Sequence, residues 1–255
     1  MHEARVSDPL KVPRLFTQVN PMTQTNAWLT ESIRFSLLGV PEGAKVSWQS
    51  IMGKDAESMT NRPAQQLVIE EGPCDNGRLV VTAQPGRIDI TMTAMPTDPV
   101  NHPSLGSFED VSSVFERRMA SIKLPTAARL AFGAVLNTFP GDSDKSKKLF
   151  KTLVPQFSID SEVDDIMLQF NRPKKLPKVS GIVLNRLTKW SQLALQTIQY
   201  QNNQALNAAS TPLIQLELDF NSHQESKLPN SSAYGSLIAA MFSEARSVVS
   251  GEAHG

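Results

Sequence analysis

A strand pattern that runs directly into a helix pattern occupies the last third of this chain. In residues 211–221 apolar side chains alternate with polar ones, as Leu218 and Phe220 do with Asp219 and Asn221. This period of two indicates a strand with one buried and one exposed face. After a short polar turn, residues 234–249 place apolar side chains on one helical stripe. The two patterns together predict a sheet covered on one face by amphipathic helices.

Related patterns recur through the rest of the chain. Alternation and turn residues predict strands at 31–39, 66–71, 78–83, 87–95, 128–139, 164–171, 179–189 and 190–200, and a further short strand at 46–51. A shift of the apolar register near Trp190 suggests a bulge or a hairpin bend. Helices are predicted at 108–124 with Ser107 as cap, after 142–144, and at 233–249. The polar residues 199–210 are interpreted as a loop.

The order of these elements predicts an α+β fold of antiparallel sheet meanders with covering helices. Short turns between successive strands imply antiparallel neighbours. We divide the chain into an irregular N-terminal arm (1–27), a first meander-plus-helix part (28–140) and a second (141–255). Whether these parts are two related halves or one domain stays open, because no residue-level repeat is evident.

Composition restricts the functional classes. The 25 basic and 25 acidic side chains balance, so bulk charge favours neither nucleic acid nor an acidic substrate. The single cysteine, Cys74, lies in a turn sequence where we expect it to be exposed, and it allows no internal disulfide. No apolar run approaches the roughly 20 residues that cross a bilayer, and the first residues do not resemble a signal peptide. We expect a soluble cytoplasmic protein without membrane contact.

Sequence signatures of common active sites are absent. The chain contains no Gly-x-Gly-x-x-Gly, phosphate-loop, Gly-x-Ser-x-Gly, His-Glu-x-x-His or Cys-x-x-Cys pattern, so no cofactor and no metal site is predicted. The best candidate for chemistry is Asp219 with His223, which share one face if the strand persists and could form a metal site or an acid–base pair. The alternative, which we favour, is that both face water. His102 is interpreted as a turn residue.

Local charge gives a second candidate site. Residues 145–189 hold ten basic and four acidic side chains, and the proline-containing segment 171–178 is the most concentrated. Such a segment suits phosphate backbones or an acidic partner. The candidate binding residues are Lys147, Lys148, Arg172, Lys174, Lys175 and Lys178. The alternatives are that these cations only solvate strand edges, or that the basic segment 171–178 pairs with the acidic residues 160–165.

Three segments (128–139, 213–221 and 233–249) resemble a family of sporadically distributed, uncharacterised bacterial proteins of similar length. The first resembles the central strand of that family, which commonly carries an Arg, a Gly and an Asn at similar spacing. The second resembles a late strand that ends in an aspartate, and the third a closing helix. The resemblance implies no catalytic residues. The patchy occurrence of the family would fit mobile-element or antiviral defence genes, by analogy only.

Three functional hypotheses follow. The first is a non-enzymatic interaction or accessory subunit of a bacterial complex, with a defence role as one version and a protein as the expected partner. The second is a nucleic-acid-binding accessory protein that uses the basic 145–189 region. The third is a metal-dependent enzyme centred on Asp219 and His223. The sequence does not indicate an oligomeric state.

Overall fold

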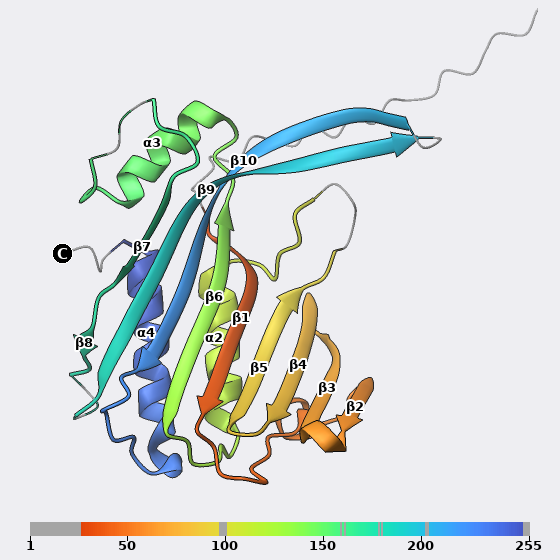
Figure 1. Ribbon diagram of the computed structural model, residues 1–255, viewed down its shortest axis with the longest axis vertical. Coiled ribbons are helices and arrows are strands. Elements are labelled where there is room, and N and C mark those ends of the chain that lie inside the picture. Colours follow the sequence, from red (N-terminus) through yellow and green to blue (C-terminus); the bar gives the residue numbers. More distant parts are fainter. Residues whose placement is uncertain are drawn as a thin grey trace, which may run out of the picture.

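The computed structural model describes residues 27–96, 101–158, 160, 162–177, 179, 181–201 and 204–251, with only the backbone of 197–209. It contains a ten-stranded antiparallel sheet with helices packed on it (Figure 1), which confirms the predicted α+β fold. Along the sheet the strands are β2 (Ser58–Arg62), β3 (Leu67–Cys74), β4 (Gly77–Gln84), β5 (Arg87–Ala94), β1 (Leu29–Leu38), β6 (Arg129–Thr138), β10 (Gln204–Ser222), β9 (Val183–Gln201) and β7 (Met167–Asn171), and β8 (Lys174–Lys175) pairs with β9. The α-helices are α1 (Trp48–Met52), α2 (Phe108–Ser121), α3 (Ser143–Leu153) and α4 (Tyr234–Val249).

Strand β6 joins the two predicted parts of the chain into one sheet. It pairs with β1 on one side and with β10 on the other. Phe35, Phe132 and Phe220 are in register across these three strands and are fully buried. Phe132 also contacts Phe242 of α4, with ring centroids 4.6 Å apart. Large aromatic rings therefore fix α4 over the centre of the sheet.

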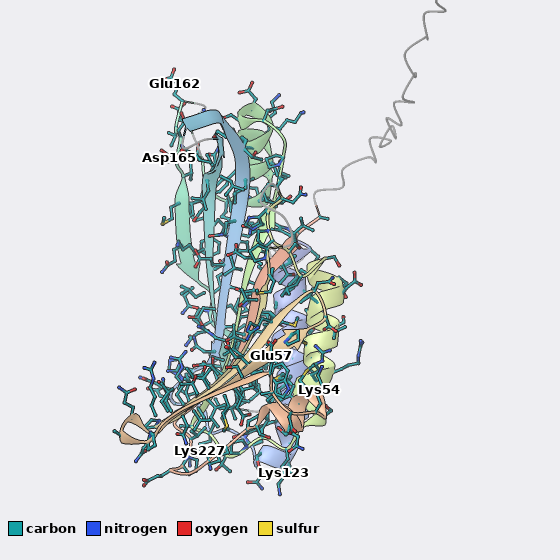
Figure 2. All side chains as sticks on the ribbon, turned by 90° about the vertical axis from the view of Figure 1, so that its right-hand side faces the viewer. Lys54, Glu57, Lys123, Glu162, Asp165 and Lys227 are labelled. Atoms are coloured by element: carbon teal, nitrogen blue, oxygen red, sulfur yellow. The ribbon has the colours of Figure 1, made fainter. Side chains whose placement is uncertain are left out.

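The two long helices cover one face of the sheet, as Figure 2 shows from the side. Helix α2 begins where predicted, because the Ser107 hydroxyl accepts a hydrogen bond from the Asp110 N–H. Helix α4 buries the apolar stripe predicted from the sequence, from Tyr234 to Val248. The other face of the sheet carries no helix of the described chain.

The predicted short strand at 46–51 is wrong, since this segment forms helix α1. The Ser47 side chain accepts a hydrogen bond from the Ser50 N–H at the start of the helix. Gly53 ends the helix in the left-handed conformation, with φ 68°. These caps outweigh the strand preference of a short apolar pattern. The following strand, β2, was not predicted.

The predicted loop at 199–210 is also wrong, because β9 and β10 form one long hairpin through it. Their register runs from Leu184 opposite Ser222 to Gln201 opposite Gln204, with one irregularity between Ala205 and Asn207. Backbone pairing needs no apolar side chains, so a polar strand carries a weak sequence signal. The predicted break near Trp190 is likewise absent from β9, which is continuous there.

Cys74 is buried at 2% exposure, contrary to the expected exposed thiol. It ends β3 before a two-residue turn, and its Sγ lies 3.7 Å from the Sδ of Met92. Burial raises the pKa of the Cys74 thiol to about 11, although the nearby Arg118 opposes that shift. The thiol therefore belongs to the core.

No helix in the described part of the chain has the length and apolarity needed to span a membrane.

Candidate functional site

The uncovered face of the sheet carries charged and amide side chains at its centre. We call this surface the polar face and define it by residues of β5, β1, β6 and β10, namely Arg87, Asp89, Arg34, Ser36, Arg129, Gly133, Asp219 and Asn221. They share one face because strand residues two apart point the same way and these strands are in register. The Phe35, Phe132 and Phe220 row occupies the opposite face.

One side of the polar face is organised around Asp89. Arg87 donates two hydrogen bonds to its carboxylate, from Nε at 2.6 Å and from Nη2 at 3.0 Å. The Ser36 hydroxyl donates a third. The hydrogen bond to Asp89 raises the pKa of the Arg87 guanidinium, and the negative charge of Asp219 adds to this effect. Arg87 is therefore held as a cation close to the middle of the face.

The other side is organised around Asn221. Its Oδ1 accepts hydrogen bonds from Nη2 of Arg129 and from Nδ2 of Asn185, the latter at 3.2 Å. The Nε of Arg129 also donates to the backbone carbonyl of Ser222 at 3.0 Å. These bonds connect β6, β10 and β9 and fix the orientation of Arg129. Neither Asn221 nor Arg129 lies at the centre of the polar face, where Arg34 and Asp219 are found.

Arg34 and Asp219 lie on either side of Gly133 at that centre. The register places Arg34 and Asp219 both opposite Gly133, one on β1 and one on β10. A Cβ added to Gly133 would lie 3.4 Å from Nη2 of Arg34, so the glycine leaves room for the guanidinium. The Nε of Arg34 is buried and has no hydrogen-bond partner among the described residues. The Asp219 carboxylate accepts one long bond, 3.5 Å, from Asn221. Both groups keep most of their binding capacity unused.

His102 belongs to a cluster that sequence reasoning missed. Its Nε2 lies 2.8 Å from Nδ2 of Asn137 and 3.5 Å from Oε2 of Glu31. Nδ2 of Asn137 also donates to Glu31, and Gln215 donates to Oδ1 of Asn137. Glu31 sits at the irregularity in the β1–β6 register between Thr30 and Ser32. The contacts join residues far apart in sequence, so no local pattern could have found them.

The predicted basic residues are distributed over two places. Lys147 and Lys148 lie on α3, whereas Lys174 and Lys175 form β8, and Figure 1 shows β8 at the start of the long strand β9 and α3 well away from it, beside the middle of that strand. Arg172 lies between β7 and β8, with its guanidinium 4.8 Å from the ring centre of Phe170. Lys178 lies outside the described residues.

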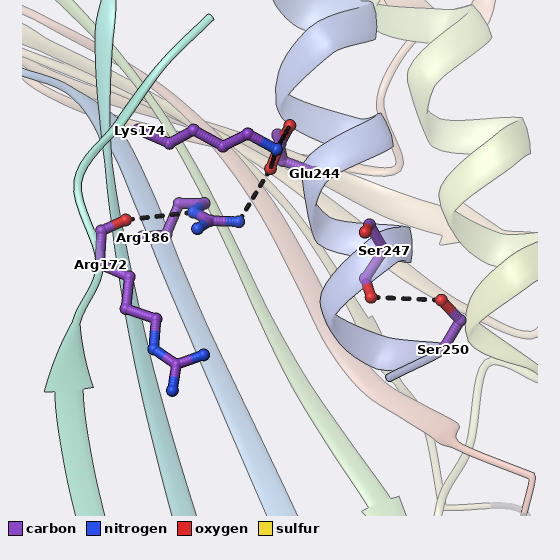
Figure 3. Close-up of polar contacts among 6 residues, drawn as sticks. All are labelled: Arg172, Lys174, Arg186, Glu244, Ser247 and Ser250. Atoms are coloured by element: carbon purple, nitrogen blue, oxygen red, sulfur yellow. Dashed lines mark hydrogen bonds and ion pairs between the residues drawn. The ribbon is translucent and has the colours of Figure 1, made fainter. Parts of the chain in front are cut away.

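Several of these cations are already paired within the chain. Lys147 contacts Asp164 at 2.8 Å, and this hydrogen bond raises the pKa of the lysine. Lys174 and the buried Arg186 both reach Glu244 of α4, at 2.7 and 2.9 Å, and Figure 3 shows this triad. The acidic run 160–165 therefore contacts α3, whereas its expected partner was the basic segment 171–178, from which Lys174 pairs with Glu244. Lys148 and Lys175 are exposed.

Asp219 and His223 do not form a metal cluster in this structure. His223 follows the end of β10, where its Nδ1 accepts a hydrogen bond from the Glu225 N–H at 3.3 Å. The described residues contain no group of three or more His, Cys, Asp or Glu side chains placed to hold a metal ion. Asp219 instead belongs to the polar face.

Comparisons of the chain with protein-family models, with curated proteins and with solved structures give no match. The family resemblance therefore stays a prediction. Two residues singled out by it, Gly133 and Asp219, lie opposite each other on the polar face. Arg129 of the same segment also belongs to this face.

Proposed function

We propose that the protein is a non-enzymatic interaction subunit of a bacterial complex, and that its polar face binds a protein partner. The observation that supports this proposal most strongly is that the Nε of Arg34 is buried without a hydrogen-bond partner among the described residues. A buried donor without an acceptor costs about 1–3 kcal/mol, so a fold gains nothing by keeping one. The Arg34 side chain is only partly buried, so a partner that places a carboxylate or carbonyl oxygen over Gly133 would give this guanidinium an acceptor.

The surroundings of Arg34 suit such a contact. Arginine is enriched among the residues that dominate protein interfaces, because its planar fork binds carboxylates in two places. Arg87 and Arg129 are held by Asp89 and Asn221, so they are oriented before any partner arrives. Asp219 offers an acceptor beside Arg34. We expect a partner surface with an acidic and a basic or amide group side by side.

The nucleic-acid hypothesis has less support from the geometry. Lys147 and Lys174 are engaged with carboxylates, and the two groups of lysines lie on separate elements. A phosphate backbone would have to compete with these ion pairs. The metal-enzyme hypothesis lacks a described ligand cluster and is not developed further. A role in antiviral defence rests on the family resemblance alone.

Quantitative affinity capture tests the proposal. Tagged wild-type protein, Arg34→Gln and Asp219→Asn would be expressed at native level in the source cells and captured after mild cross-linking. Arg117→Gln is the matched control, because Arg117 is an exposed arginine on α2, away from the polar face. We expect a protein that wild type and the control recover and that both face variants lose. Equal recovery by all four proteins would reject the polar face as the binding surface.

A further inference from the structure

The β9–β10 hairpin extends well beyond the rest of the sheet (Figure 1). The last residue of β10 paired with β6 is Ile214, opposite Thr138, and the last residue of β9 paired with β7 is Ser191, opposite Met167. We call the part beyond these pairs, residues 192–201 and 204–213, the arm. Isolated two-stranded ribbons are marginally stable in water, because they bury little apolar surface. A projecting ribbon of this length therefore needs a partner.

The arm contains no charged side chain. From residue 190 to residue 216 the sequence has no Asp, Glu, Lys or Arg. Strand edges in monomeric proteins are commonly protected by charges, by proline or by bulges. A segment without cations is also unsuited to nucleic acid. The composition favours a neutral surface as the occupant.

The two edges of the arm differ. Even-numbered residues of β9 direct their backbone groups toward β7, since the Arg186 carbonyl accepts from Arg172 N–H and the Gln192 N–H donates to the Ile166 carbonyl. By strand alternation, residues 194, 196, 198 and 200 direct theirs to the same side, where no described segment pairs with them. On β10, Pro212 lies opposite Ala194, so the position of its missing N–H faces the other outer edge. Proline thus interrupts the β10 edge and leaves the β9 edge open.

We propose that the open β9 edge of the arm pairs with the same edge of a second copy of this chain. Antiparallel pairing about a two-fold axis brings even-numbered residues of one copy opposite even-numbered residues of the other, which is the parity that backbone hydrogen bonding requires. Because the arm is uncharged, the second copy brings no like charges together. The result is a four-stranded ribbon that connects two sheets. This inference does not depend on the polar face.

Oligomeric state in solution tests the inference. Sedimentation velocity of the full chain over a concentration series should give a species of twice the chain mass. Gln196→Pro removes an outward N–H from the β9 edge and should give the monomer. Ser210→Pro is the matched control, because Ser210 lies directly opposite Gln196 and its backbone faces the β10 edge. It should leave the dimer intact.

Two charged variants at the same position test the pairing without proline, in case Gln196→Pro disturbs the fold of the arm itself. With the two-fold axis at the middle of the β9 part of the arm, where Gln196 lies, Gln196→Lys and Gln196→Glu should each be monomeric alone, and mixing them at low salt should restore the dimer. A monomeric wild type, a dimer that survives Gln196→Pro, or a dimer that Ser210→Pro abolishes would each overturn the inference. So would a stable complex of the β9 edge with a different protein in place of the second copy.

Discussion

Arg34 and Asp219 face the same residue, Gly133, from opposite sides, yet no ion pair joins them. Pairing would satisfy a half-buried guanidinium and a half-buried carboxylate at once. Instead, the neighbouring arginines form the hydrogen bonds of this region, Arg87 with Asp89 and Arg129 with Asn221. This arrangement leaves one cation and one anion open at the centre of a face that is otherwise internally satisfied. Substitutions of these residues should therefore change the free energy of unfolding and the binding of a partner.

Arg34→Met should increase the free energy of unfolding by about 1 kcal/mol, because it removes a buried donor without an acceptor and keeps the apolar stem. Arg129→Met should instead decrease it by about 1–2 kcal/mol, since the Ser222 carbonyl loses the Arg129 Nε donor and Oδ1 of Asn221 keeps only the donor from Asn185. Urea unfolding of both variants measures the difference. A loss of stability in Arg34→Met equal to that in Arg129→Met would show that Arg34 is structural.

Gly133→Ala should weaken partner binding and change the free energy of unfolding by less than about 1 kcal/mol, because its Cβ would occupy the space beside the Arg34 guanidinium while only making ordinary contacts, 3.4 Å from Nη2 of Arg34 and from the Leu218 carbonyl. Gly235→Ala in α4 is the control, since nothing lies within 4 Å of its added Cβ. That substitution should stabilise the helix by up to about 1 kcal/mol and leave binding unchanged. Thermal unfolding measures the effect of each substitution on stability, and affinity capture measures its effect on partner binding.

Glu244→Gln should lower the free energy of unfolding by about 3 kcal/mol, because the Arg186 guanidinium would be left buried without a counter-charge. The Arg186 and Glu244 side chains are 10% and 12% exposed, whereas Lys174 is 42% exposed. Lys174→Met should therefore cost less than about 1 kcal/mol. Similar costs for the two variants, measured by urea unfolding, would contradict this division of the triad.

Cys74 should make stability fall at high pH. Burial raises its pKa from 9.0 to about 11, so between these values the unfolded thiol releases its proton while the folded thiol keeps it. The free energy of unfolding then decreases as pH rises, by about 3 kcal/mol from this group. Comparing wild type with Cys74→Ala across that range isolates the thiol from other titrating groups. In the folded protein Cys74 should resist thiol reagents at pH 8 and react after unfolding. Rapid modification of the native protein would contradict its burial.

Much of the fold could be predicted from apolar periodicity. Helices α2 and α4 and strand β6 appear as expected, because each carries a clear apolar pattern toward the core, and α2 also has the Ser107 cap. In the arm, the strand predicted at 190–200 covers most of the β9 part, whereas the β10 part was missed at 204–210, where a polar and weakly apolar sequence was interpreted as a loop. Helix α1 was missed because it has only five residues, and its caps Ser47 and Gly53 outweigh the strand-like apolar pattern.

The candidate site was harder to predict, because it depends on pairing between distant strands. Asp219 was singled out, but with His223 as its partner, since neighbours in sequence were the only neighbours visible. Gly133 and Arg34 could not be linked to Asp219 from the sequence, because only the β1–β6–β10 register places them side by side. The basic residues were visible as a charge excess, and the acidic run that contains Asp164 was visible beside them, but Glu244, the partner of Lys174, comes from the distant helix α4.

The affinity of the captured partner for purified wild type and for Arg34→Gln tests the central proposal most directly. Calorimetry should show that Arg34→Gln costs about 2 kcal/mol or more of binding free energy, as expected for a desolvated arginine at an interface centre. Arg117→Gln should bind as wild type does. An affinity of Arg34→Gln equal to that of wild type would contradict the proposal that this guanidinium anchors the partner on the polar face.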